Sequence, residues 1–450
     1  MMKGIIVSGA GSTIMRLLDM AVAVFLLRWL SLFEYGTYRL SLASYELFAS
    51  LFLAGLENVV VSDVAGELSR DARKAKSFFS FYVYCMVFVG VVLWALFFLG
   101  GDAITGWFIQ GNNSHYLKIV SFLFLLAPFE TAYKLKFQIF LDFEWGAFFR
   151  IFGSIARLAI VILYFFVSSF GVKEALWSVI LSGGIPLLIA AIGYRRESLF
   201  IFPRRSEIKN IAVSLFLGHG KWALIGDFVN NANQSIRPFI IKAFVGTEAV
   251  ALISVAQNLI SYAKSLFPIR DILSPVLPRA LHDPKRLYMQ INRATKYATV
   301  GYIFLGLASG LGAPLLIYTL FPKYMSSLPI FYILLLGFPF QGFRLVAPPV
   351  FYALKEQRVL TRVTVGRTLL LIPLNALFTY FFGIWGAATE MLLLGLLTTP
   401  AYVHALHAVL PEWTFQWRDI YSFDDYDRRV LLDIKDHAKE KIKRFLPRFS

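Results

Sequence analysis

Cysteine and charged residues are both scarce in this sequence. The chain has 450 residues, of which one is cysteine (Cys85) and 16% are charged. A single cysteine excludes an internal disulfide, and a soluble protein of this length usually carries more charge over two or three domains. Apolar residues take their place, because 58% of the chain is hydrophobic and the mean hydropathy is +0.64. The composition predicts a membrane protein.

The apolar residues form twelve runs of the length that crosses a bilayer as a helix, which is about 20 residues. The first six predicted helices are Ile5–Leu30, Tyr35–Val61, Phe78–Leu99, Leu117–Tyr133, Phe148–Val167 and Ala175–Tyr194. The second six are Ile211–Ile241, Ala249–Leu277, Tyr297–Leu320, Pro329–Leu354, Val363–Phe382 and Ala387–Leu410. We therefore expect an all-α polytopic membrane protein.

The placement of Lys and Arg predicts the orientation. Nearly all cations in the connections follow even-numbered helices, and those after odd-numbered helices are Lys118, Lys173, Lys242 and Lys323. Cytoplasmic loops carry the excess of Lys and Arg. Both termini are therefore expected on the cytoplasmic side.

Two halves of the sequence resemble each other in charge. When the second half is laid on the first, Arg28, Glu34 and Glu57 fall on Lys242, Glu248 and Asp271. Parallel repeats of six helices are related by an axis along the membrane normal, with the substrate path between them. The expected organisation is a six-helix lobe at 1–194, a cytoplasmic linker at 195–210, a second six-helix lobe at 211–410 and a cytoplasmic tail at 411–450. A pseudo-two-fold axis along the membrane normal would relate the lobes around a central polar cavity.

Charged side chains recur inside the apolar runs at helical spacings that place several on one face. The first predicted helix carries Arg16 and Asp19, and the second carries Arg39 and Glu46. The others are Arg157 in the fifth helix, Asp227 and Arg237 in the seventh, Lys264 in the eighth, Arg344 in the tenth and Arg367 in the eleventh. We expect the first, second, seventh and eighth helices to line one polar cleft.

An ionised side chain at mid-bilayer costs about 3 kcal/mol on insertion, so these groups must face protein or water. A net positive interior favours an anionic substrate such as a phosphate or a carboxylate, which arginine binds in bidentate geometry. In the alternative interpretation the charges neutralise one another or reach outward near helix ends. The acidic residues either bind Na⁺, shuttle protons or pair with nearby cations; they are Asp19, Glu46, Glu130, Asp227 and Glu390.

The tail from Pro411 to Ser450 combines an apolar stripe with many Lys and Arg residues. We expect it to lie as an amphipathic helix on anionic lipids of the inner membrane surface. The alternative is a helix packed on the cytoplasmic loops.

Short motifs at the helix ends resemble those of a known family. The segment Leu26–Tyr38 (LLRWLSLFEYGTY) is similar to the junction of the first two helices in oligosaccharide flippases of the multidrug/oligosaccharidyl-lipid/polysaccharide exporter superfamily. Similar turns are Gly55-Leu56, Val245-Gly246, Gly171 and Gly383. The resemblance covers about residues 4 to 410.

This resemblance implies a non-enzymatic transporter of the cytoplasmic (inner) membrane. Its substrate would be a polyprenyl-pyrophosphate-linked oligosaccharide, turned to the outer leaflet by alternating access. The implied substrate-binding residues are Arg16, Arg237, Lys264 and Arg344, together with Arg39, Arg157 and Arg367. Asp19, Glu46 and Asp227 are the candidates for coupling to H⁺ or Na⁺, and no cofactor is implied. Where the family often has an acidic-basic pair, this chain has Asn233-Gln234-Ser235. A polysaccharide polymerase or assembly machinery is an expected partner, and nucleic acid is not.

Two other functions stay open. A drug exporter of the same superfamily would share the architecture, but cationic drugs favour an acidic cavity. A membrane glycosyltransferase or polysaccharide polymerase would need catalytic residues in a long outward loop. The longest such loop, Gly100–Tyr116, offers only Asp102 and His115 for acid-base chemistry.

Overall fold

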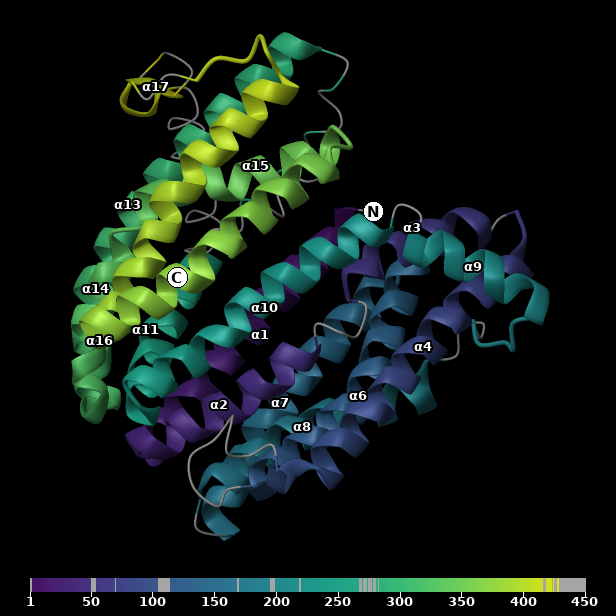
Figure 1. The fold of residues 1–450 in the computed structure, drawn as a ribbon, viewed down its shortest axis with the longest axis horizontal. Coiled ribbons are helices and arrows are strands. Elements are labelled where there is room, and N and C mark those ends of the chain that lie inside the picture. The colour runs from purple at the N-terminus through teal and green to yellow at the C-terminus, as the bar shows by residue number, and fades with distance from the viewer. Residues whose placement is uncertain are drawn as a thin grey trace, which may run out of the picture.

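The computed structural model is built of helices (Figure 1). It describes residues 2–49, 54–68, 70–103, 114–167, 170–194, 199–217, 220–266, 269, 273, 277, 281, 283–415, 418–422, 424, 427 and 428. The helices of the first half are α1 (Met2–Trp29), α2 (Leu32–Ala49), η1 (Ala54–Leu56), α3 (Glu57–Leu68), α4 (Ala72–Leu99), α6 (Ser114–Ile139), α7 (Phe143–Val167) and α8 (Val172–Gly193). Then follow α9 (Arg205–Leu217), α10 (Gly220–Phe244), α11 (Thr247–Ser265), α13 (Pro284–Leu320), η3 (Pro322–Ser327), α14 (Leu328–Leu335), η4 (Phe338–Phe340), α15 (Gln341–Ala353), α16 (Gln357–Val409) and α17 (Arg418–Tyr421). The predicted all-α fold is confirmed.

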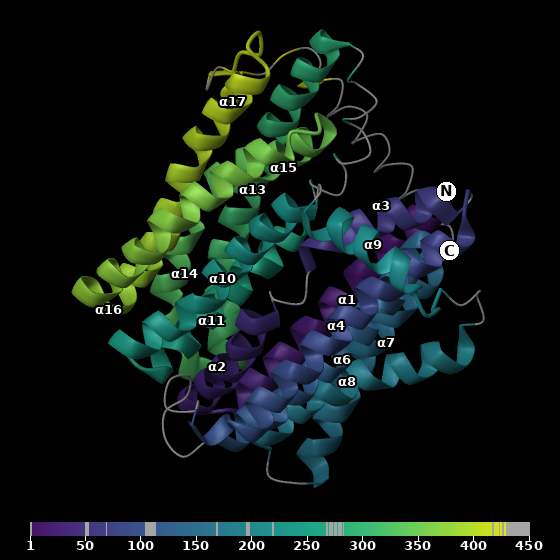
Figure 2. The ribbon, with the colours of Figure 1, turned by 45° about the vertical axis from the view of Figure 1, so that its right-hand side comes forward.

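The helices form two groups that diverge from a shared end (Figures 1 and 2). In the first group α1 packs on α7, α4 on α6, and α7 on α8. In the second group α10 packs on α16, α13 on α15, and α11 on α14. Helix α2 joins the groups, because it packs on α6 and α8 of the first and on α10 and α11 of the second.

The close approach of α2 and α11 explains one motif of the sequence. A Cβ atom at Gly36, in the second turn of α2, would overlap the carbonyl oxygen of Thr247 at the start of α11. Gly246, which precedes α11, has a φ of +120°, a conformation that favours glycine. Gly36 therefore permits the contact between the two groups, and Gly246 permits the turn that begins α11.

The eleventh and twelfth predicted helices are the two arms of α16, and the chain reverses between them at Gly383. This glycine has φ +57° and ψ −137°. The reversal is evident from contacts across it: Asn375 Nδ2 donates to Glu390 Oε2 at 2.9 Å, and a Cβ atom at Gly386 would overlap the carbonyl oxygen of Phe378. In one continuous helix these residues would be far apart, so α16 is a helical hairpin.

Several helices are long and apolar enough to span a membrane. In the described part of the chain there are six, namely α4, α6, α7, α8, α13 and α16, or seven if the bent pair Pro322–Leu335 and Phe338–Ala353 is one span. Large apolar side chains such as Leu311, Ile192 and Phe166 are 83%, 80% and 78% exposed, which a soluble surface would not tolerate over such an area. The protein is a multi-pass membrane protein. The number of twelve spans and the symmetry axis stay predictions.

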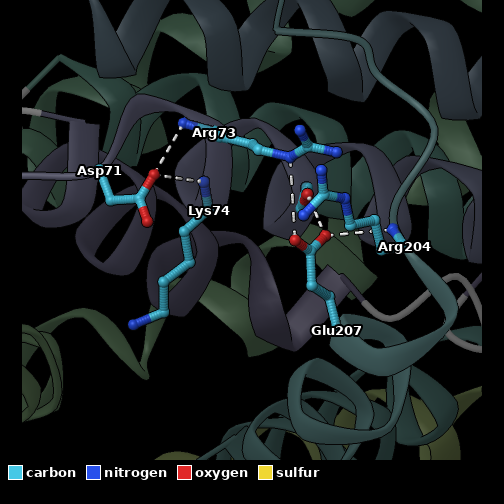
Figure 3. Close-up of polar contacts among 6 residues, drawn as sticks. Asp71, Arg73, Lys74, Arg204 and Glu207 are labelled. Carbon is cyan, nitrogen blue, oxygen red and sulfur yellow. Dashed lines mark hydrogen bonds and ion pairs between the residues drawn. The ribbon is translucent and has the colours of Figure 1, made fainter.

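The connection between the two halves is attached to the first group through α9 (Figure 3). The Glu207 carboxylate accepts hydrogen bonds from Ser77 Oγ of α4 at 2.7 Å and from the Arg204 backbone N–H at 3.1 Å. Arg73 Nε lies 3.9 Å from the same carboxylate. Asp71 caps α4 by accepting from the backbone N–H groups of the second and third residues after it.

The described part of the tail packs on the protein. Trp413 is completely buried and its Nε1 donates to Asn292 Oδ1 of α13 at 2.8 Å. Farther along, Asp427 pairs with Lys296 and accepts from the Tyr297 hydroxyl at 2.6 Å. The described part of the tail therefore agrees with the alternative prediction, in which the tail packs on the protein. Most of the predicted basic amphipathic helix lies outside the described residues.

Candidate functional site

A cavity of about 390 Å³ lies in the second group of helices and is also lined by residues of α2. Its walls come from α2, α10, α11, α14, α15 and α16. Five of the seven predicted substrate-binding cations line it, namely Arg39, Arg237, Lys264, Arg344 and Arg367. The predicted gathering of cations from distant segments is therefore seen for these five.

Arg237, on α10, is held by a buried carboxylate. Its Nη2 lies 3.0 Å from Glu390 Oε1, and the two side chains are 9% and 0% exposed. The other carboxylate oxygen of Glu390 accepts from Asn375 Nδ2. Because Asn375 and Glu390 stand on opposite arms of the α16 hairpin, the hairpin builds the acceptor that holds Arg237.

Lys264 and Arg344 converge on a neutral group. The amide oxygen of Gln341 accepts from Lys264 Nζ and from Arg344 Nη1, each at 3.2 Å, in the amide orientation that satisfies its hydrogen bonds. Gln341 begins α15 and Arg344 follows it by three residues, so both lie on one helix face. Gly395 lines the cavity beside them, and a Cβ atom there would lie 3.4 Å from Arg344 Nη1.

Positive charge exceeds negative charge around the cavity. Among the described residues, the lining includes one carboxylate, that of Glu46 on α2, and Glu390 stands behind Arg237. Five cations against these two carboxylates leave a formal charge of +3. Amide groups of Asn233, Gln234 and Gln257 complete the polar wall.

Two predicted cations lie elsewhere. Arg16 Nη1 donates to the carbonyl oxygen of Ser265 on α11, and Arg157 Nη2 donates to the Tyr38 hydroxyl at 2.6 Å. These contacts belong to the packing of α1 and α7 against α2 and α11. The expected lining by the first helix is not seen among the described residues.

The predicted acidic residues also separate. Glu46 lines the cavity, whereas Asp19 lies outside its lining and accepts from Ser154 Oγ at 2.9 Å. Asp227 lies in α10, and its side chain is outside the described residues.

Sequence reasoning missed Gln341 and Asn375. A neutral amide lowers the hydropathy of an apolar run as other polar residues do, but it carries no charge that would indicate a partner. The spacing of three residues between Gln341 and Arg344 is the one feature that pointed to a shared face. The contact between Asn375 and Glu390 could not be predicted either, because it requires the reversal at Gly383, which places residues from two predicted helices side by side.

Comparisons with known proteins agree with this architecture. A family described as "Polysaccharide biosynthesis protein" matches residues 25–323. The teichuronic acid biosynthesis protein TuaB of Bacillus subtilis (strain 168) is 22% identical over 199 residues, which are 44% of this chain and 40% of that protein. The chain thus matches less than half of the length of this curated relative.

Solved structures share the fold at low identity. The lipid II flippase MurJ in an inward closed conformation superposes with a TM-score of 0.73 at 15% identity, over 92% of this chain and 89% of that one. An inward-facing MATE multidrug resistance transporter gives 0.68 at 15% identity, over 87% and 95%. A MOP superfamily transporter of Pyrococcus furiosus Vc1, whose binding pocket is described as having reverse polarity, gives 0.65 at 14% identity, over 94% and 97%. The chain belongs to the polysaccharide biosynthesis protein family and has the fold of the MOP superfamily transporters.

Proposed function

We propose that the protein moves a polyprenyl-pyrophosphate-linked oligosaccharide across the cytoplasmic membrane by alternating access. The observation that supports it most directly is the surplus of cations: five line the cavity with one carboxylate, and a second carboxylate, that of Glu390, stands behind Arg237. Family membership and the fold shared with a lipid II flippase support the same class of substrate.

The physical argument rests on the cost of unpaired charge. A cation held within the membrane region is expensive unless water or an opposite charge compensates it. A pyrophosphate group supplies compact negative charge and several acceptor oxygens, which guanidinium groups bind in a bidentate manner. The surplus of cations therefore suits the charged end of such a lipid.

The contacts between the two groups of helices suit a transporter that is closed at one end. Lys323 Nζ donates to the Arg28 carbonyl oxygen at 2.9 Å, and the Tyr324 hydroxyl donates to the Leu30 carbonyl oxygen at 3.2 Å. These bonds attach the end of α1 and the residue after it to the second group, at the end where α2 and α11 begin. In our proposal this end faces outward, both chain termini are cytoplasmic, and a gradient of H⁺ or Na⁺ drives the cycle.

Reconstitution tests the proposal. Liposomes with the protein and a fluorescent polyprenyl-pyrophosphate oligosaccharide should show transfer of the label between leaflets. Arg344→Ala and Arg367→Ala should slow this transfer, whereas Lys209→Ala, an exposed cation of α9, should not. Transfer that is unaffected by the cavity variants would refute the proposal.

A drug exporter is the second candidate, because MATE transporters share the fold. The surplus of positive charge disfavours cationic drugs. Efflux of a cationic dye from the same liposomes, without transfer of the labelled lipid, would assign the protein to that class.

A further inference from the structure

The cations of the cavity differ in how they are compensated. Arg237 has a full counter-charge, because Glu390 lies 3.0 Å away and is itself fixed by Asn375. This pair is buried and neutral as a unit. An incoming anion would have to compete with Glu390 for the guanidinium group. In this arrangement Arg237 should therefore bind a substrate anion only weakly.

Lys264 and Arg344 have no such counter-charge. In the part of the chain that the structure describes, no carboxylate forms an ion pair with either side chain. Their shared partner is the amide oxygen of Gln341, at 3.2 Å from each. A neutral oxygen orients both donors but cancels no charge, so two like charges are held near one point.

The surroundings leave this point accessible. Gly395 and Gly337 line the cavity and present no side chain to it. Lys264 Nζ lies 6.0 Å from the ring centre of Phe338, which is almost completely buried. On this side the ammonium group therefore faces an apolar ring instead of water. Desolvation of this kind strengthens the attraction for an anion.

We propose that Lys264, Arg344 and Gln341 form the subsite for the phosphoryl groups of the substrate. Gln341 is its positioning residue: it fixes the two cations without neutralising them. The inference rests on the proposed function and assigns the pyrophosphate to these three residues. Arg237 and Glu390 then serve as a structural pair in the same cavity wall.

A change of one atom in the Gln341 side chain tests the proposal. Gln341→Glu keeps the size of the side chain but places a carboxylate between the two cations. Inorganic pyrophosphate is titrated into the purified full-length protein in detergent, and the heat of binding is measured. Because a hydrogen bond to a charged group contributes about 10- to 100-fold in affinity, we expect Gln341→Glu to weaken binding by about that factor.

Three matched variants separate the position of the charge from its presence. Gln257→Glu adds the same charge to another part of the cavity wall and should weaken binding less than Gln341→Glu. Gln341→Leu removes the amide without adding charge and should also weaken binding less. Gln138→Glu, on an exposed position of α6, should leave binding unchanged. Melting curves of each variant show whether the fold is retained.

The outcomes are distinct from those of the transport assay. If the wild type does not bind pyrophosphate, or if Gln341→Glu binds as well as the wild type, the subsite is overturned, even where lipid transfer is intact. A loss with Gln257→Glu as large as with Gln341→Glu also overturns it, since net charge alone would then explain binding. Selective loss with Gln341→Glu supports the subsite, even where no lipid transfer is detected.

Discussion

Replacing Glu390 by alanine removes the counter-charge of a buried arginine and leaves two donors without an acceptor. Glu390 is 0% exposed and Arg237 is 9% exposed. Removing one partner of a buried ion pair costs about 3 to 5 kcal/mol, and an orphaned amide donor adds about 1 kcal/mol. Because Arg237 also borders the cavity, where water can reach its guanidinium, we expect a loss of about 3 kcal/mol in the free energy of unfolding.

The measurement is unfolding by sodium dodecyl sulfate in mixed micelles, followed by circular dichroism. A double-mutant cycle with Arg237→Met separates the pair from its surroundings. The double variant Arg237→Met/Glu390→Ala should cost much less than the sum of the two single variants, because no charge is left unpaired. A single-variant loss below about 1 kcal/mol, or additive losses, would refute the reasoning.

Three further predictions concern the hairpin and the tail. Gly386→Ala should prevent stable folding, because its Cβ atom would overlap a backbone carbonyl oxygen across the hairpin, whereas Gly366→Ala, with open space around it, should express and melt normally. Trp413→Ala should free the tail at a local cost of about 3 to 5 kcal/mol, which limited proteolysis at the tail measures as faster cleavage. Burial raises the pKa of Asp427, but hydrogen bonds from Lys296 and a tyrosine outweigh it and lower the pKa overall. The tail contact should therefore be complete at pH 7 and weaken only below about pH 4; weakening of tail protection between pH 7 and pH 5 in the same assay would contradict this.

The sequence was sufficient to predict helices, because apolar runs of bilayer length leave little choice of structure. It also identified all five cations that line the cavity in the described part of the chain, since a charge in such a run must find water or a partner. Arg16 and Arg157 show where this reasoning ends: helical spacing tells which residues share a face, but not which neighbour that face meets. Both faces meet other helices, where carbonyl and hydroxyl oxygens accept from the guanidinium groups.

The neutral members of the site were beyond prediction for a different reason. Gln341 differs little from other polar residues in an apolar run, and its role depends on two side chains that converge on it from α11 and α15. The Glu390 pair depends on a backbone reversal at one glycine. Neither arrangement leaves a periodic pattern.

The reversal at Gly383 also fixes the depth of the buried charge pair. Glu390 follows the turn by about two helical turns, which is about 10 Å along the axis at 1.5 Å per residue. The number of residues between Gly383 and Glu390 sets both the depth of the carboxylate in the bilayer and the direction in which it points. One residue inserted between Gly383 and Glu390 would rotate the carboxylate by about 100° around the helix axis, away from Arg237. We therefore expect the spacing of this segment to be as strictly limited as the identity of its residues.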